Sequence, residues 1–495
     1  MSSAKPDRVS TGVAGLDDIL TGGLPRERIY LVQGDPGVGK TTLGLQFLLA
    51  GVENDEKTLY VSLSETKEEI NSVAASHGWS LSRISLYELS AVEASLQLGT
   101  DNTVFHPAEV ELREIMKTLL AVVDDVKPNR VVFDSLSEIR TLSQNQAQYR
   151  RQILQLKQYF VGRKTTVMLL DDRTGPDGDT QLQSLAHGVI QLEQLPQSYG
   201  TERRRIRITK LRGLKFRGGY HDYKIETGGL TVYPRLIASE HPHELRRQPL
   251  SSGLKELDAL TGGGLDAGTS TLVLGPAGAG KSTVMVHYAV AAAREGRGAA
   301  IFCFDEGRAT LLARARSIGL DIEPELKAGR LTLRQIDPAE MSPDELAHAV
   351  RDEVERGIGF VAIDSLNGYL NAMPDEKFLA IQLHELLSYL AHKGVVTMMV
   401  MAQHGLVGNM QSPIDVTYVA DSLILLRFFE AQGSVHKAIS MLKKRSGRHE
   451  SSIRELTMGT SGLKVGEPLK EFHGVLTGVP YFKVSNPDVH EPGKR

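Results

Sequence analysis

Two glycine-rich stretches have the residue types and the spacing that hold the phosphates of a nucleotide. Residues 34–41 read GDPGVGKT and residues 275–282 read GPAGAGKS, and both fit the pattern G-x-x-x-x-G-K-[ST]. The glycines let backbone N–H groups converge on phosphate oxygens, the lysine neutralises phosphate charge, and the Thr or Ser hydroxyl binds Mg²⁺. The pattern therefore predicts two sites for ATP and Mg²⁺, formed by Gly37, Val38, Gly39, Lys40, Thr41 and Thr42 in the first and by Gly278, Ala279, Gly280, Lys281, Ser282 and Thr283 in the second.

An aspartate stands at the end of an apolar run in each half of the chain. Asp134 follows the run RVVF, Asp364 follows the run FVAI, and both are followed by Ser-Leu. An acid at the end of a buried strand, close to a phosphate-binding loop, is the position that organises Mg²⁺ in nucleotide hydrolases. We therefore predict that Asp134 assists Thr41 in the first metal site and that Asp364 assists Ser282 in the second.

Hydrolysis also needs a base that orients or deprotonates water. A glutamate lies at the same spacing in both halves, because Glu65 and Glu306 each follow the phosphate-loop lysine of their half by 25 residues. We predict Glu65 as the catalytic residue of the first site, and Asp305 with Glu306 as those of the second, Asp305 being also a candidate metal ligand. The first site has one carboxylate here and the second has two, because Ser64 stands at the position of Asp305. The number of carboxylates therefore favours faster hydrolysis at the second site.

Cation pairs recur late in each half, in the segments KLR (Lys210, Leu211 and Arg212) and KKR (with Lys443 and Arg445). The spacing K-x-R on a strand places both cations on one face, because side chains alternate with a period of two. Such a pair can reach the γ-phosphate of a nucleotide, here that of a neighbouring subunit. A solvated basic strand is the alternative, and the eight Lys or Arg residues within 203–217 keep a nucleic-acid-facing stripe open.

The candidate residues recur because the chain contains a long internal repeat. Residues 10–42 align with residues 251–283 without a gap, at an offset of 241. Each half also alternates near-continuous apolar runs, typical of strands buried on both faces, with helix-like amphipathic stretches. These runs are 28–34, 57–63, 130–136 and 165–171 in the first half, and 270–275, 299–304, 359–365 and 395–402 in the second.

This pattern predicts an α/β fold with two tandem domains, each built on a mainly parallel central sheet. We expect the first domain at 1–238, a polar linker at 239–250, the second domain at 251–470 and a C-terminal tail at 471–495. At about 100–200 residues per domain the 495 residues allow two to four domains, and the internal repeat sharpens this number to two.

Composition narrows the class of protein. The 57 Lys and Arg residues against 60 Asp and Glu residues give a net charge of −3, which disfavours nucleic acid as a partner. A single cysteine, Cys303, indicates a reducing compartment. The polar start has no secretory signal and no run of 18 apolar residues offers a membrane span, so we expect a cytoplasmic protein without a membrane partner.

On these motifs the chain resembles KaiC and the KaiC-like ATPases of the RecA superfamily across nearly its whole length. The resemblance rests on the tandem phosphate loops, the opening S-x-G-x-x-x-L-D of each half, VVFDS and VAIDS, KLRG, and KKRSGRHESSIREL. It implies two RecA-like P-loop domains per subunit and a homohexamer with nucleotide at the subunit interfaces. It also implies a slow ATPase in the first domain and an autokinase with autophosphatase activity in the second.

The resemblance implies further roles for single residues. The adjacent phosphoacceptors of the family fall on Thr417 and Tyr418, and the positions near the adenine fall on Ser76, His77 and Ile318. The alternative for the segment of Thr417 and Tyr418 is an ordinary interface strand. The alternative for His77 is a plain surface residue. The family also implies a circadian-clock or signalling role, with KaiB-like or other regulatory proteins docking on the tail.

Two other functions stay open from the residues. A DNA-associated ATPase of the RecA or DnaB kind would need basic, glycine-rich loops, for which the segment 203–217 is the candidate. A nucleotide-gated scaffold without kinase activity would use ATP only to hold an assembly together, and Ser64 makes this alternative credible for the first domain.

Overall fold

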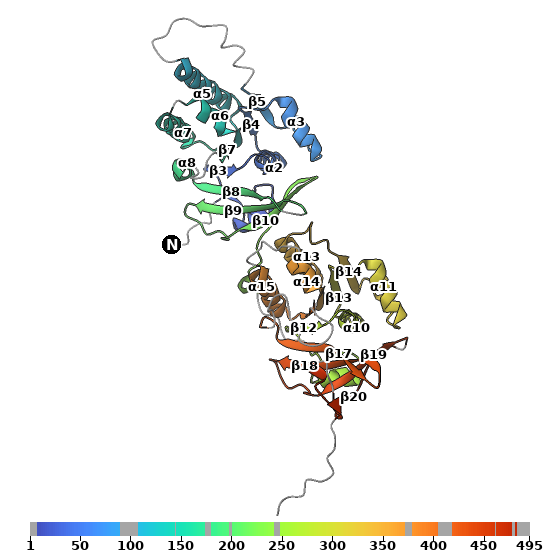
Figure 1. Ribbon diagram of the computed structural model, residues 1–495. Coiled ribbons are helices and arrows are strands. Elements are labelled where there is room, and N and C mark those ends of the chain that lie inside the picture. Colours follow the sequence, from blue (N-terminus) through green and yellow to red (C-terminus); the bar gives the residue numbers. More distant parts are fainter. Residues whose placement is uncertain are drawn as a thin grey trace, which may run out of the picture. The chain divides into compact units, whose positions relative to one another are not determined.

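The computed structural model describes residues 7–89, 107–143, 145–173, 180–197, 200–241, 248–371, 379–403, 418–460, 462–477 and 481–482. The chain divides into two compact units, unit 1 (Met1–Arg235) and unit 2 (Leu236–Arg495). Each unit is an α/β domain, shown in Figure 1. The bounds of the linker and the tail given above remain predictions.

Unit 1 begins with a short β-pair and then alternates strands and helices. Its elements are β1 (Arg8–Val9), α1 (Ala14–Ile19), β2 (Leu24–Pro25), β3 (Ile29–Gly34), α2 (Lys40–Glu53), β4 (Thr58–Ser62), α3 (Lys67–Ser76), β5 (Ser85–Glu88), α5 (Pro107–Val126), β6 (Arg130–Asp134), α6 (Leu136–Leu142), α7 (Gln146–Phe160), β7 (Thr166–Asp172), α8 (Thr180–Leu185), β8 (Gly188–Leu195), β9 (Arg203–Leu211), β10 (His221–Glu226) and β11 (Gly229–Tyr233).

Unit 2 repeats this order and ends in a small β-pair. Its elements are η1 (Ala238–Glu240), α9 (Lys255–Leu260), β12 (Ser270–Gly275), α10 (Lys281–Arg294), β13 (Ala299–Cys303), α11 (Arg308–Ser317), α12 (Glu323–Lys327), β14 (Leu331–Gln335), α13 (Pro343–Glu355), β15 (Phe360–Asp364), α14 (Leu366–Asn371), α15 (Leu379–His392), β16 (Val396–Ala402), β17 (Ser422–Ala431), β18 (Ser434–Lys444), β19 (Ile453–Gly459), β20 (Gly462–Pro468), β21 (Phe472–His473), η2 (Val475–Thr477) and β22 (Tyr481–Phe482).

The central sheets of the two units have the same topology. In the described residues of unit 1 a nine-stranded sheet has the order β11-β10-β9-β8-β3-β7-β6-β4-β5, and in unit 2 the order is β20-β19-β18-β17-β12-β16-β15-β13-β14. The strands from β8 to β5 are parallel, and β9, β10 and β11 continue the sheet antiparallel. The prediction of two mainly parallel α/β domains is confirmed.

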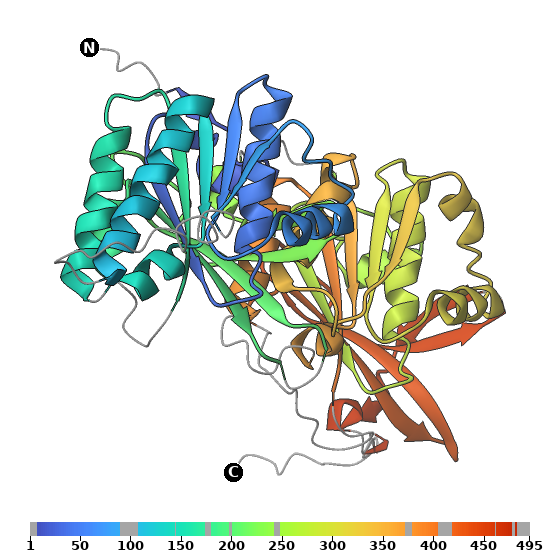
Figure 2. The same cartoon turned by 90° about the horizontal axis from the view of Figure 1, so that it is seen from above.

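Helices cover both faces of each sheet, as the views in Figures 1 and 2 show for unit 1, with α2 on one face and α5, α6 and α7 on the other. The strand β3 illustrates why. Tyr30 and Val32 lie in the core cluster that includes α2, whereas Ile29 and Leu31 lie in the cluster of the opposite face. Because successive side chains alternate between faces, a strand that is apolar at every position needs a layer of helices on each side.

The repeated opening S-x-G-x-x-x-L-D fixes the start of each unit. The Ser10 hydroxyl and the Thr11 backbone N–H both donate to the Asp17 carboxylate, at 2.6 and 2.8 Å. Ser251 and the backbone N–H of Ser252 bond to Asp258 in the same way, at 2.5 and 2.7 Å. This part of the repeat therefore has a structural role, in which the aspartate side chain holds the turn that precedes it.

A fully buried histidine, His221, lies at the start of β10. Its Nδ1 accepts a hydrogen bond from the backbone N–H of Arg235 at 2.8 Å, and its Nε2 lies 3.2 Å from the carbonyl oxygen of Arg217. This pairing requires the neutral ring with the proton on Nε2. Burial lowers the pKa of His221 to about 4.

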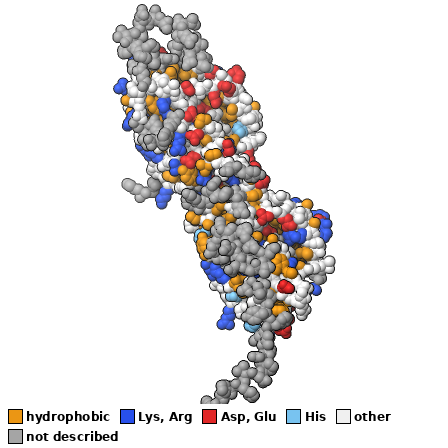
Figure 3. Space-filling model, viewed as in Figure 1, with side chains coloured by type: hydrophobic (Ala, Val, Ile, Leu, Met, Phe, Trp, Pro, Cys, Tyr) orange, Lys and Arg blue, Asp and Glu red, His pale blue; other side chains and the backbone are white. Residues whose placement is uncertain are grey.

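The surface of each unit carries charges of both signs, which are interspersed on the face shown in Figure 3. Several cations of the basic segment 203–217 pair with nearby acids. Arg204 contacts Glu202 at 3.3 Å, and Arg217 contacts Asp18 at 2.6 Å. Over the described residues, no helix combines the length and the apolar character needed to cross a membrane.

Candidate functional site

The phosphate loop of each unit joins a central strand to a helix. In unit 1 the loop connects β3 to α2, and Gly37 and Gly39 have φ values of 84° and 92°. In unit 2 it connects β12 to α10, and Gly278 and Gly280 have φ values of 78° and 105°. This left-handed backbone is strained for any residue with a Cβ, which explains the glycines. The loops therefore present the N-terminus of a long helix, the end that attracts anions.

The P-loop lysine of unit 1 is held by its own loop and by one carboxylate. Lys40 Nζ donates to the carbonyl oxygens of Gly34 and Asp35, both at 2.9 Å, and forms an ion pair with Asp172 at 2.8 Å. Burial acts to raise the pKa of Asp172, but the hydrogen bonds from Lys40 and Ser137 outweigh it, and the pKa is lowered. Lys40 is therefore already paired with an ionised carboxylate, that of Asp172.

The predicted metal pair of unit 1 is assembled. The Thr41 hydroxyl donates to Asp134 Oδ2 at 2.7 Å, and the Tyr60 hydroxyl donates to the same oxygen. Burial raises the pKa of Asp134, since the surrounding strands exclude water from the carboxylate. A bound cation would stabilise the ionised form of Asp134, so the Thr41–Asp134 pair has the chemistry of a metal-binding site.

Glu65 faces the same cleft. Its Oε2 is buried and has no hydrogen-bond partner. Burial, followed by the nearby charge of Asp134, raises the pKa of Glu65. A half-buried carboxylate with a free acceptor and a raised pKa has the properties of a general base.

These residues line one cleft of about 580 Å³. That volume lies in the range of about 300–1,000 Å³ typical of small-molecule sites. The cleft opens at the carboxyl ends of the parallel strands, the usual position for ligands of α/β sheets. Its lining consists of Pro36, Gly37, Gly39, Lys40, Thr41, Thr42, Ser64, Glu65, Val73, Asp134, Ser135, Asp172, Arg204 and Ile225.

Unit 2 assembles the equivalent groups with different partners. The hydroxyl of Ser282 hydrogen bonds to Asp364, whose pKa is raised by burial. Lys281 Nζ donates to the carbonyl oxygen of Pro276 at 2.7 Å. Among the described residues no carboxylate forms an ion pair with Lys281.

The acidic pair of unit 2 is also engaged. The hydroxyl of Ser365 donates to Asp305. Arg314 donates to both oxygens of Glu306, from Nε at 3.1 Å and from a terminal nitrogen at 2.6 Å. Glu306 therefore lies in a bidentate ion pair, whereas Glu65 has no such partner.

Besides Ser64 in place of Asp305, the two sites differ at two further equivalent positions. Gly34 of β3 pairs with Asp172 of β7, whereas Gly275 of β12 pairs with Ala402 of β16. Unit 2 therefore has no carboxylate where unit 1 places the partner of its lysine. Arg314 of α11 corresponds, at the offset of 241, to a valine of α3 in unit 1.

The cation pairs bond to backbone carbonyl oxygens, and Lys210 and Arg212 are not among the residues that line the unit 1 cleft. Lys210 Nζ donates to the carbonyl oxygens of Gln183 and Ser184 at 2.6 and 3.1 Å, and Arg212 donates to that of Ser184 at 2.7 Å. In unit 2, Lys443 donates to Ala420 at 2.7 Å and Arg445 donates to Tyr418 at 2.8 Å. Leu211 is buried in the core next to Lys210. Both members of each pair therefore face the same backbone segment.

The residues assigned to the adenine lie at helix ends, outside the lining of the cleft. The Ser76 hydroxyl donates to the carbonyl oxygen of Val73 at 2.7 Å. His77 Nδ1 lies 2.8 Å from the carbonyl oxygen of Glu226, and its ring lies 4.7 Å from that of Trp79. Ile318 packs against the core of unit 2.

Of the two candidate phosphoacceptors, Thr417 lies outside the described residues. Tyr418 is described, and its side chain is 60% exposed. Its carbonyl oxygen, as noted, accepts the hydrogen bond from Arg445.

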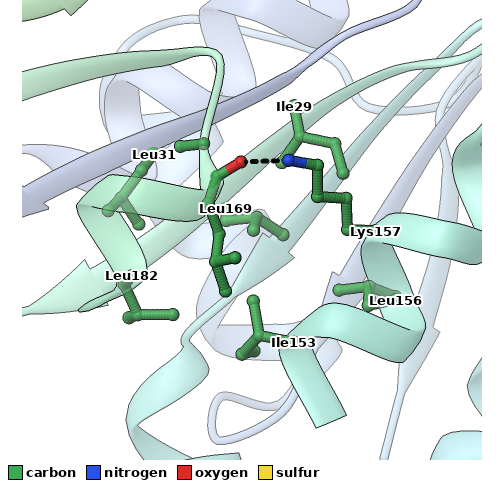
Figure 4. Close-up of a pocket in the computed structure, with 9 residues that line it drawn as sticks. Ile29, Leu31, Ile153, Leu156, Lys157, Leu169 and Leu182 are labelled. Carbon is green, nitrogen blue, oxygen red and sulfur yellow. Dashed lines mark hydrogen bonds between the residues drawn. The ribbon is translucent and has the colours of Figure 1, made fainter. Parts of the chain in front are cut away.

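A small apolar hollow in unit 1 lies apart from the cleft (Figure 4). It is lined by residues of β3, β7, α7 and α8, and in it Lys157 Nζ donates to the carbonyl oxygen of Leu185 at 2.8 Å. Lys157 therefore binds the same C-terminal end of α8 as Lys210 and Arg212, where cations stabilise the helix dipole.

Comparison with known proteins gives a consistent result. The sequence model of the family described as "ATPase: KaiC" matches residues 9–237 and, a second time, residues 250–470. The chain belongs to the KaiC family. The KaiC-family ATPase domain is thus present in two copies, which agrees with the two phosphate loops and the two hydroxyl–aspartate pairs.

Curated relatives span almost the whole chain. The "Circadian clock oscillator protein KaiC" of Thermostichus vulcanus is 27% identical, with 97% of this chain and 93% of the relative covered. The "Circadian clock protein KaiC3" of Synechocystis is 25% identical, with 96% and 95% covered. The KaiC of Prochlorococcus marinus is 25% identical, with 97% of both chains covered. The repeated KaiC architecture is therefore shared from end to end.

Three residues of the sites escaped the sequence reasoning. Asp172 directly follows the run 165–171, which is predicted as a strand, so an acid at a strand end was the available signal. Arg204 lies within the recognised basic segment. Arg314 carried no signal, because only the folded α11 brings it against Glu306.

Proposed function

We propose that the protein binds Mg²⁺-ATP at both phosphate loops and hydrolyses it. The observation that carries this proposal is the duplicated group of a phosphate loop, a hydroxyl–aspartate pair and an acid at the next strand end. Each group is built at equivalent positions of two KaiC-family ATPase domains. When bound, ATP supplies the bond that is cleaved, and Mg²⁺ neutralises charge on its phosphates.

The protein residues then have distinct tasks. The helix N-termini and Lys40 or Lys281 bind phosphate oxygens. The pairs Thr41–Asp134 and Ser282–Asp364 hold the metal ion. Glu65 accepts the proton of the attacking water in unit 1, which its free buried oxygen supports.

We further propose that the protein assembles as a homohexamer with nucleotide at the subunit interfaces. Lys210 and Arg212 lie outside the lining of the unit 1 cleft, which supports a role of this pair, and of its equivalent Lys443–Arg445, towards a neighbouring subunit's phosphate. Unit 2 would act as an autokinase on Thr417 or Tyr418. The names of the relatives support a circadian or related regulatory role, with KaiB-like or other regulatory proteins as partners.

The test combines ATP turnover with sizing chromatography. We expect phosphate release by the wild-type chain, its loss in the double variant Lys40→Ala/Lys281→Ala, and a ring-sized species that depends on ATP. Release of phosphate by the double variant would contradict the assignment of the sites, and an ATP-independent ring would contradict the interface position of the nucleotide. Ring formation without any turnover would favour a scaffold.

A further inference from the structure

Arg314 joins the acidic pair of unit 2 to its phosphate-loop helix. Its guanidinium donates to both oxygens of Glu306, at 3.1 and 2.6 Å, and a third nitrogen donates to the hydroxyl of Thr283 at 3.3 Å. Thr283 is buried in α10, directly after the lysine and the serine of the loop. A planar guanidinium held at three points fixes the orientation of the carboxylate that it binds.

Unit 1 offers a natural comparison at the same position. The helices α3 and α11 occupy equivalent places, and Val73 stands in α3 where Arg314 stands in α11. Val73 lines the unit 1 cleft beside Glu65, and the Glu65 carboxylate keeps a buried oxygen without a hydrogen-bond partner. The chain thus has a cation paired with Glu306 in unit 2, and an apolar residue at the equivalent position of the cleft that Glu65 lines in unit 1.

The contacts of a carboxylate decide whether it can hold a water molecule in line with a phosphate. A base must come within about 2.6–3.2 Å of the proton that it takes. The guanidinium occupies one acceptor site on each oxygen of Glu306 and fixes the plane of the group. Glu306 must turn out of this clamp, or act with reduced freedom, whereas Glu65 has no clamp to leave.

We propose that Arg314 is a positioning residue that restrains Glu306 and thereby slows ATP turnover in unit 2. The inference rests on the proposed nucleotide chemistry of the two clefts. It makes Arg314 and Val73 the residues that set the two units to different rates, in addition to the number of carboxylates in each.

The experiment exchanges the two residues in the full chain. Unit 2 is measured in the Lys40→Ala background and unit 1 in the Lys281→Ala background, with turnover and the affinity for a fluorescent ATP analogue recorded for each. We expect Arg314→Val to raise kcat of unit 2 at least about fivefold, and the reciprocal Val73→Arg to lower kcat of unit 1 by a similar factor. Arg314→Lys, which keeps the charge without the two-point contact, should give an intermediate kcat.

Two further measurements separate restraint from other roles. The affinity of unit 2 for the analogue should change less than about twofold in Arg314→Val, since the clamp acts through Glu306 and not on the nucleotide. Adding Glu306→Gln should abolish the gain in kcat.

The inference is overturned by a kcat of unit 2 that stays constant or falls in Arg314→Val, by a tenfold change in affinity, or by a faster Val73→Arg unit 1. Val73→Arg keeps the test decisive if Arg314→Val does not fold. Loss of both turnover and analogue binding in the parent backgrounds would instead refute the proposed nucleotide function itself.

Discussion

Removing the charge of Asp172 should tighten nucleotide binding in unit 1. Lys40 is paired with this carboxylate at 2.8 Å, so a phosphate must compete with Asp172 for the lysine. Two unit charges about 4 Å apart interact by about 4 kcal/mol at an effective dielectric constant of about 20. Asp172 is 29% exposed and partly screened by water, so we take about 1–2 kcal/mol as the part that nucleotide binding must overcome. Asp172→Asn should therefore lower Kd roughly 5–30-fold.

The assay is a titration with a fluorescent ATP analogue in the Lys281→Ala background, so that only unit 1 responds. Asp55→Asn is the matched control, because it removes the same charge beyond the other end of α2, where Asp55 is 91% exposed. We expect Asp55→Asn to leave Kd unchanged. An unchanged or higher Kd in Asp172→Asn would refute the competition and would make Asp172 a ligand of the nucleotide or its metal ion.

Three other predictions concern His221, the pair Glu65 and Glu306, and Thr417. His221 is buried as a neutral ring with a pKa of about 4, so between about pH 4 and 6.5 the unfolded chain binds a proton that the folded chain does not bind. Acidification from pH 7 to 5 should therefore lower the free energy of unfolding, measured by chemical denaturation, by about 1–2 kcal/mol. His221→Gln should make the free energy of unfolding depend less on pH. Because Arg314 holds Glu306 and no such partner holds Glu65, Glu65→Gln should lower total ATP turnover more than Glu306→Gln does. This order is the reverse of the one that the carboxylate count favours, and equal losses of turnover would contradict it. Incubation with ATP should place phosphate on Thr417, and phosphopeptide mass spectrometry that finds none on residues 411–430 would reject the autokinase.

Much of the fold could be predicted because its buried central strands stand in the sequence as near-continuous apolar runs. All eight apolar runs became central strands, with ends that differ by at most two residues. The run 130–136, for example, ends as a strand at Asp134, since Ser135 turns the chain into the next helix. The antiparallel strands β10 and β11 had no comparable signal, because strands near the edge of a sheet mix polar and apolar residues.

The site was predictable where its parts are close in sequence or repeat in register. The phosphate loops and the aspartates Asp134 and Asp364 carry their own spacing, and the fold brings each aspartate to its hydroxyl. Ion pairs across elements are different, because Lys40–Asp172 and Glu306–Arg314 depend on which strands and helices become neighbours. Such partners are set by tertiary structure, and no local pattern reports them.

Nucleotide stoichiometry tests the central claim most directly, namely that each unit carries its own phosphate-binding site. Equilibrium dialysis with a non-hydrolysable ATP analogue and Mg²⁺ should give two molecules per wild-type chain. It should give one in Lys40→Ala, one in Lys281→Ala, and none in the double variant. A wild-type chain that binds one molecule or none, or a double variant that still binds two, would contradict the account.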